Sequence, residues 1–316
     1  MNFKTFLNFT RIQTLPVALL SPLAGMMFSL WYFRSFHLIQ TILFVIGLIA
    51  INLFVSAWNN LMDYYKAKDP EYKARENIIS NRNIPPKLAL MTCLFLLFID
   101  VIVGIIVLFL TNLAILPVGG LCFLVAIFYT FGPFAFSRFP LGEILAGLCE
   151  GFFGFFLAVY INSYDQNYFS IHFEGLKMNW VWDFSALFPI VLVGLICFFQ
   201  NFNVMLSDNI CDLEQDIKNE RFTLPYYLGI PFSLIVYRVM YLIPLVCLFL
   251  SLYFKTLPLS SLLMLFILPL LFSNMKHFLA KQVKSETFHY QIDNLILYNG
   301  SLAASLLLGI LIRGFH

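Results

Sequence analysis

The sequence predicts an all-α, polytopic membrane protein: a bundle of nine transmembrane helices forming a single domain over residues 1–316. Of the 316 residues, 60% are hydrophobic and only 11% are charged, with a mean hydropathy of +0.84. Soluble domains carry about a quarter charged residues. Apolar runs near the ~20 residues that cross a bilayer as a helix recur along the whole chain. They are too long and too uniformly apolar for barrel strands, which alternate over ~10 residues.

The nine predicted helices follow one another in the order of the apolar runs. The first run is expected to be a membrane helix rather than a signal peptide, because Pro16 and Pro22 interrupt it and it lacks a small-residue cleavage site. The connection at 162–183 mixes aromatic and polar residues, which favours an interfacial loop. The predicted spans are 15–31, 39–60, 88–110, 114–132, 143–161, 185–205, 231–254, 258–275 and 291–312.

Basic residues predict how the bundle is oriented. With the amino terminus inside, fourteen of the 19 lysines and arginines fall in cytoplasmic segments, and the other side has only Arg34, Lys177, Lys255 and Arg313. We therefore expect a multi-pass protein of the cytoplasmic membrane with its polar connections in the cytoplasm. The net charge of +2 gives no reason to expect nucleic acid as a partner. The six cysteines are scattered singly, which favours neither a zinc site nor a disulfide framework.

Two cytoplasmic connections, at 59–87 and 206–230, contain most of the polar chemistry. "WNNLMDYYKAKD" follows the second predicted helix and "LSDNICDLEQD" follows the sixth. Four helices separate these acidic segments, and an even number places both on one side of the membrane, as in a parallel internal repeat. The two segments are therefore expected to face each other.

Helical spacing places the acids of each segment together. Asn59 and Asp63 share a face if the second helix continues through them. Asp69 cannot share that face and precedes Pro70, so it is expected to reach in from the loop after the helix. In the second segment, the same four-residue spacing relates Asp208, Asp212 and Asp216. Five aspartates are thus expected to converge on one pocket.

Such a cluster repels itself unless cations neutralise it. Magnesium suits paired aspartates because it takes one or two carboxylates and completes its octahedron with waters and substrate phosphate. Two magnesium ions bridging a diphosphate would nearly cancel the charge. Basic side chains on the same side are expected to bind the remaining phosphate oxygens: Arg11, Lys66, Lys68, Arg138 and Arg221.

Four stretches of the chain resemble one known family. They are "RIQTLPVALLSPLAG", "NNLMDYYKAKD", "FYTFGPFAFSRFPLGE" and "DNICDLEQDIKNERFTLPYYLG". Together, in order and spacing, they are similar to the UbiA-type intramembrane aromatic prenyltransferases. Within that family the chain looks most like the menaquinone-pathway branch, which prenylates 1,4-dihydroxy-2-naphthoate. The resemblance spans residues 11–229.

The resemblance implies a nine-helix UbiA-type fold and a magnesium-dependent reaction. A polyprenyl group would pass from an allylic diphosphate to 1,4-dihydroxy-2-naphthoate, with loss of carbon dioxide, giving a demethylmenaquinone-type product. Its implied catalytic residues are Asp63, Asp212 and Asp216. The implied magnesium ligands are Asn59, Asp63, Asp69, Asp208, Asp212 and Asp216. Tyr129, Glu143 and Asn209 are implied to line the substrate cavity.

The chain departs from the family pattern at three positions. Asn60 replaces a usual aspartate, Cys211 the usual arginine, and Asp208 an asparagine. One acid is thereby lost and another gained. Separately, Asp100 and Glu150 fall inside apolar spans, where an ionisable residue costs free energy and suggests a function.

Two other interpretations stay open. Within the enzyme class, the acceptor would be another aromatic compound, such as 4-hydroxybenzoate or a porphyrin. From a different class, a cation-coupled transporter would also be polytopic with acids, but such proteins usually place them near the bilayer midplane on broken helices. Here the acids cluster at predicted helix ends, which favours the enzyme.

Overall fold

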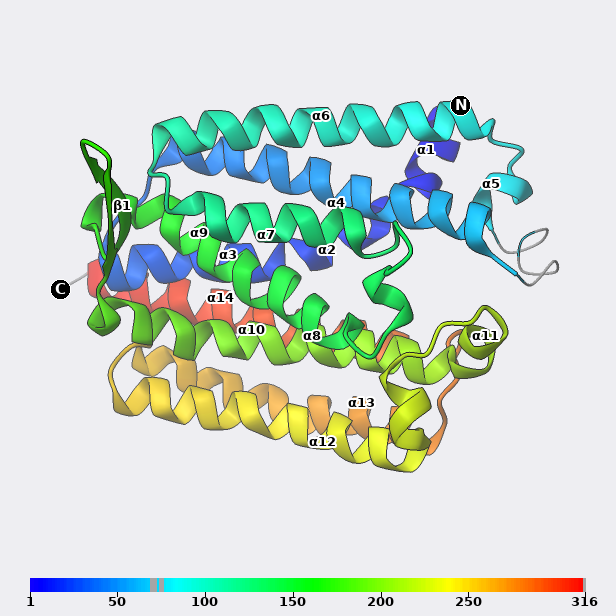
Figure 1. The fold of residues 1–316 in the computed structure, drawn as a ribbon. Helices are drawn as coiled ribbons and strands as arrows, with labels where there is room; N and C mark the ends of the chain where they lie inside the picture. The colour runs from blue at the N-terminus through cyan, green and yellow to red at the C-terminus, as the bar shows by residue number, and fades with distance from the viewer. Residues whose placement is uncertain (69–72, 74–76, 315–316) are drawn as a thin grey trace.

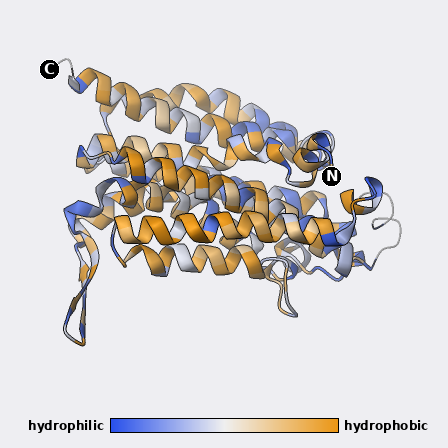
Figure 2. Ribbon diagram, turned by 90° about the horizontal axis from the view of Figure 1, so that it is seen from above, coloured by the Kyte–Doolittle hydropathy of each residue, from blue (hydrophilic) through white to orange (hydrophobic). Residues whose placement is uncertain are grey.

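The computed structural model describes residues 1–68, 73 and 77–314 of the chain. Long helices run side by side along one axis (Figure 1). Hydrophobic residues dominate the middle of these helices, whereas hydrophilic residues gather toward their ends (Figure 2). The prediction of a polytopic all-helical bundle is therefore confirmed.

Eight helical stretches in the described residues are long and apolar enough to cross a membrane: Ile12–Phe33, Leu38–Lys66, Pro86–Leu110, Gly142–Gln166, Phe184–Cys211, Leu224–Tyr253, Leu259–Ala280 and His289–Gly314. The remaining predicted span, 114–132, contains a shorter apolar helix, α7 (Ile115–Phe128). Its 14 residues extend about 21 Å at 1.5 Å per residue. That is less than the ~30 Å hydrocarbon core, so the expected count of nine full spans is not confirmed.

The amino-terminal half is interrupted early by prolines. Pro16 lies in the first turn of a four-residue helix, where its missing N–H costs no hydrogen bond. The elements in order are α1 (Phe3–Phe9), a 3₁₀ turn (Ile12–Thr14), α2 (Leu15–Ala18), α3 (Leu20–Phe28), a π-helical turn (Ser29–Phe33), α4 (Leu38–Lys66), α5 (Ile78–Asn81), α6 (Pro86–Leu110) and α7.

The second half begins with a 3₁₀ turn at Phe136–Arg138. Its further elements are α8 (Gly142–Ala146), a π-helical turn (Gly147–Phe153), α9 (Gly154–Ser163), a 3₁₀ turn (Tyr164–Gln166), β1 (Phe169–Glu174), β2 (Lys177–Trp182), α10 (Phe184–Cys211), α11 (Leu213–Lys218), α12 (Leu224–Tyr253), a 3₁₀ stretch (Leu259–Ile267), α13 (Leu268–Ala280) and α14 (His289–Gly314). A kink interrupts α12 at Gly229, whose φ of 71° favours glycine.

Glycines bring the central helices into close contact. A Cβ on Gly25 of α3 would lie 2.4 Å from the carbonyl oxygen of Phe155 in α9. A Cβ on Gly151 would similarly lie 2.6 Å from the carbonyl oxygen of Cys197 in α10. Small residues permit this approach of backbones, which is how membrane helices pack without a hydrophobic driving force between them. The π-helical turn Gly147–Phe153 therefore packs closely against α10.

The expected interfacial loop at 162–183 contains a β-hairpin. β1 and β2 pair antiparallel, with Phe169 opposite Trp182. The rings of Trp180 and Trp182 stack 5.8 Å apart, and Phe169 packs edge-on against both. The hairpin lies at one end of the bundle and α11 at the other (Figure 1). We name these the hairpin end and the acidic end, the latter comprising segments 59–68 and 206–221.

Candidate active site

One face of α4 presents the first acidic segment. Asn59 accepts a hydrogen bond from the Thr130 hydroxyl at 2.9 Å, and Lys66 donates to the carbonyl oxygens of Thr130 and Gly132 at 2.7 and 2.8 Å. Asp63, four residues after Asn59, lies between these two anchors on the helix and is half-buried. Both Asp63 and Arg138 lie near enough to Lys66 to act on its charge. This face is therefore held against the segment that follows α7.

The second acidic segment keeps helical spacing although α10 ends at Cys211. The backbone N–H of Asp212 donates to the Asp208 carbonyl at 3.0 Å, and that of Asp216 to the Asp212 carbonyl at 2.8 Å. The buried Asp216 pairs with Arg221 at 3.4 Å. Burial raises the pKa of Asp216 to about 6 and, with the charge of Asp208, also raises the pKa of Asp212.

Lys284 is a residue of this site that the sequence did not indicate. It lies in the connection between α13 and α14, and its Nζ contacts Asp208 Oδ1 at 2.9 Å and Asp212 Oδ2. Burial acts to lower the pKa of Lys284, but the two carboxylates outweigh it and raise the pKa. The sequence indicated only that Lys284 lies on the same side of the membrane as the acids, which holds for many other lysines and arginines. The contact with Asp212 spans 72 positions of sequence.

The two acidic segments meet, as their spacing in the sequence led us to expect. The Lys68 backbone N–H donates to Asn219 Oδ1 at 3.2 Å, and the Lys68 side chain pairs with Glu220. Arg138 donates to the Asn219 carbonyl at 3.4 Å, and the Phe222 N–H donates to the Arg138 carbonyl at 3.0 Å. Lys68 thus joins the two segments directly, and Arg138 joins the connection after α7 to the second segment.

Tyr129, Glu143 and Asn209 form a polar layer beside these segments. Asn209 Nδ2 donates to Glu143 Oε1 at 2.7 Å, and Glu143 is fully buried. A Cβ on Gly142 would lie 3.0 Å from the Tyr129 hydroxyl and 3.9 Å from Asn209 Nδ2. The absence of a side chain at Gly142 therefore lets the Tyr129 hydroxyl, just after α7, approach the start of α8.

An apolar cavity of about 480 Å³ runs from this polar layer along the bundle. Its walls come from α4, α6, α7 and the α8–α9 stretch, with Asn59 and Tyr129 at the acidic end. Further along, Asp100 and Glu150 also face it. Glu150 keeps more than a third of its surface accessible despite its place in a membrane-spanning stretch, because it borders this space.

Several predicted site residues are not brought together. Arg11 donates to Asn60 Oδ1 at 2.9 Å in a separate polar pocket beside α1 and α5. Asp69 lies outside the described residues. Within the described residues, no group of three or more histidine, cysteine, aspartate or glutamate side chains is placed to hold a metal ion. The expected convergence of five aspartates therefore stays a prediction; in this structure Asp216 pairs with Arg221.

Comparison with known proteins identifies the family. Residues 18–295 match the sequence profile of the UbiA prenyltransferase family. The chain belongs to the UbiA prenyltransferase family. It is accordingly an enzyme of the prenyltransferase class. No curated protein sequence matches it.

Solved structures of UbiA homologues share its fold. That from Aeropyrum pernix K1 has a TM-score of 0.69 at 16% identity, covering 93% of this chain and 98% of that one. A homologue from Archaeoglobus fulgidus bound to GPP and Mg²⁺ has a TM-score of 0.63 at 13% identity, covering 97% and 99%. A digeranylgeranylglyceryl phosphate synthase has a TM-score of 0.64 at 16% identity, covering 98% of each chain.

The acidic end of this UbiA-family chain has carboxylate oxygens of the kind that bind a divalent cation. Oδ2 of the buried Asp216 has no hydrogen-bond partner among the described residues. Asp208 and Asp212 already share one cation, the Lys284 ammonium. Carboxylate oxygens are among the ligands that magnesium prefers. The residues therefore fit magnesium, provided that Lys284 changes its partners.

Proposed function

We propose that the chain transfers a polyprenyl group from an allylic polyprenyl diphosphate to a small aromatic acceptor, 1,4-dihydroxy-2-naphthoate. The acceptor would lose carbon dioxide, as in menaquinone biosynthesis. The observation that carries this proposal is the position of two contacting acidic segments beside the end of an apolar, membrane-deep cavity. The acids suit the metal-bound diphosphate, and the cavity suits the hydrocarbon chain.

Two magnesium ions would be held, because each of the two acidic segments supplies ligands. The ligands would be Asn59, Asp63, Asp69, Asp208, Asp212 and Asp216. Magnesium bound there supplies positive charge to the leaving diphosphate. Lys66, Lys68, Arg138 and Arg221 would donate to phosphate oxygens after exchanging their present partners. The known homologue with GPP and Mg²⁺ supports this ligand class.

The cavity walls position the reacting groups and exclude water. The allylic C–O bond breaks as the diphosphate leaves with its electron pair, and an aromatic carbon of the acceptor forms the new bond. Tyr129 would contact the acceptor or the diphosphate, since it lines the cavity at the acidic end. Glu143 and Asn209, which bond to each other beside it, would complete this polar end of the substrate cavity. Aromatic faces can stabilise a nearby cation by up to about 2 kcal/mol when desolvated.

The test is product detection by mass spectrometry. The purified protein in lipid is incubated with magnesium, geranylgeranyl diphosphate and, in parallel, 1,4-dihydroxy-2-naphthoate, 4-hydroxybenzoate or a polyprenylglyceryl phosphate. We expect a prenylated, decarboxylated naphthoate that disappears with EDTA. Product from another acceptor alone would overturn the naphthoate assignment. No diphosphate release with any acceptor or prenyl chain length would overturn the proposed prenyl transfer. Cation transport into vesicles without turnover would favour a transporter.

A further inference from the structure

The Lys284 ammonium occupies the place between Asp208 and Asp212 where a cation is needed. It contacts Asp208 Oδ1 at 2.9 Å and also Asp212 Oδ2. The two carboxylates belong to consecutive turns of the second acidic segment. A single positive charge thus neutralises part of a cluster that would otherwise repel itself.

The chain holds Lys284 at this place. The connection between α13 and α14 is closed by Thr287, whose hydroxyl accepts from the Val283 N–H at 3.1 Å and donates to the Lys281 carbonyl at 2.8 Å. Lys281 and Glu286 form an ion pair across the same turn at 2.6 Å. The backbone that carries Lys284 is therefore organised by its own contacts.

An ammonium and a divalent cation compete for these oxygens. Lys284 presents a compact charge with three donors on a flexible stem, so its head can move while its backbone stays fixed. A magnesium ion that bridges the same two oxygens at 2.0–2.1 Å would lie within a few ångströms of the ammonium and repel it. Binding of the metal in the position that Lys284 now holds therefore requires the ammonium to move.

We propose that Lys284 is a built-in counterion that competes with the divalent cation for Asp208 and Asp212, and that the diphosphate draws it away. This inference rests on the proposed function, because it assumes that metal and diphosphate meet at this site. The displaced ammonium stays beside the second acidic segment and donates to a phosphate oxygen. Lys284 is in this sense a positioning residue for the metal and the substrate.

The competition makes the two ligands depend on each other. Metal alone binds weakly, because it displaces an ammonium that gains no new partner. Metal together with diphosphate binds tightly, because the ammonium then gains phosphate oxygens. Such coupling is reciprocal, and typical couplings change affinity by about 5- to 150-fold.

The experiment measures magnesium affinity by titration calorimetry, with and without inorganic diphosphate. It compares the full-length protein in lipid with Lys284→Met, and uses Lys281→Met as the matched control. Lys281 lies in the same connection, and its side chain pairs with Glu286 rather than with Asp208 or Asp212. We expect Lys284→Met to bind magnesium alone roughly tenfold more tightly and to lose a similar factor of the diphosphate enhancement. Lys281→Met should match the wild type.

Thermal unfolding in EDTA provides a second readout. Lys284→Met leaves two carboxylates without their cation, so its midpoint should fall, and added magnesium should restore more of it than in the wild type. If Lys284→Met does not fold, Lys284→Gln serves the same comparison. Equal or weaker magnesium affinity in the folded variant overturns the role of Lys284. A wild type that binds no magnesium even with diphosphate instead overturns the proposed metal-dependent function.

Discussion

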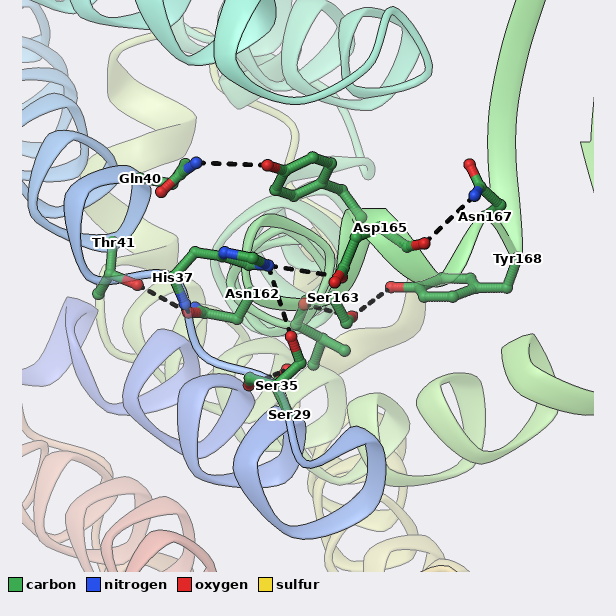
Figure 3. A network of polar contacts seen from close by, with 12 residues as sticks. Ser29, Ser35, His37, Gln40, Thr41, Asn162, Ser163, Asp165, Asn167 and Tyr168 are labelled. Carbon is green, nitrogen blue, oxygen red and sulfur yellow. Dashed lines mark hydrogen bonds and ion pairs between the residues drawn. The ribbon is translucent and has the colours of Figure 1, made fainter.

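The two ends of the bundle differ in how their buried polar groups are paired. At the hairpin end, Asn162 is fully buried, accepts from the His37 N–H at 2.9 Å and the Thr41 hydroxyl at 2.8 Å, and donates to the Ala158 carbonyl at 3.0 Å (Figure 3). Nearby, the Ser163 and Tyr168 hydroxyls are 3.0 Å apart. Around Asn162 the network joins the start of α4 to the end of α9 through neutral partners, and His37 Nε2 also lies 3.4 Å from Asp165 Oδ1.

At the acidic end, by contrast, like charges are gathered and cations come from distant parts of the chain. Burial raises the pKa of Asp216, and Asp216 Oδ2 lacks a hydrogen-bond partner among the described residues. Lys284 arrives from the connection before α14. The difference indicates that the hairpin end contributes stability, whereas the acidic end retains unfavourable electrostatics for ligands to relieve.

The largest effect should come from removing an acid of the active site. Asp63→Asn and Asp212→Asn keep side-chain size but lose a negative charge, so we expect each to lower turnover by at least about a hundredfold. Both should stay folded, because the change relieves repulsion. Prenyl transfer and thermal unfolding measure the two properties. Glu214→Gln is the matched control, since Glu214 is exposed on the same segment; an equal loss of activity there would contradict the prediction.

At the hairpin end, a substitution should instead affect stability. Asn162→Leu removes the acceptor of two donors and leaves a backbone N–H unpaired, which we expect to cost about 3 kcal/mol of unfolding free energy. The measurement is chemical or thermal unfolding in detergent. Gln40→Leu is the control, because its bond to Tyr164 is long at 3.4 Å and should matter little. A similar loss of unfolding free energy in both variants would show that the hydrogen bonds of Asn162 contribute no more than that of Gln40.

At the acidic end, the stability of the protein should depend on pH through Asp216. The native pKa of Asp216 is raised to about 6 from 3.8, so between these pH values the native protein binds more protons than the unfolded chain. Its contribution to stability therefore falls as pH rises from about 4 to 6, by about 3 kcal/mol in total. Unfolding in EDTA at several pH values, compared with Asp216→Asn, measures this contribution. Identical pH profiles for the two proteins would refute it.

The smallest effect should follow from Asn60→Asp. Asn60 accepts from Arg11 and donates from Nδ2 to the Phe9 carbonyl at 2.8 Å, away from the acidic segments' shared contacts. A carboxylate there would lose the bond to Phe9 but gain charge complementarity with Arg11, so stability should change by about 1 kcal/mol or less. Turnover should stay within about twofold. A large gain in magnesium affinity would instead place residue 60 among the metal ligands.

The sequence by itself determined the class of the protein and the local chemistry of its acidic segments. Composition established the membrane bundle, and helical periodicity related Asp208 to Asp212 and Asn59 to Asp63. Both properties are local, because burial in lipid and a 3.6-residue repeat act on neighbouring residues. The short α7 departs from this pattern, since apolar runs do not reveal where a helix gives way to a turn.

Only the tertiary structure decided which side chains meet. It placed Lys284 between two aspartates, joined Arg11 to Asn60, and brought Asn209 onto Glu143. Glycine at 142 permits the close approach of the Tyr129 hydroxyl beside that last pair, and no periodicity in the sequence encodes it. These contacts depend on how helices far apart in the chain pack, so residue spacing placed the acids along each segment while the packing of the bundle selected their partners.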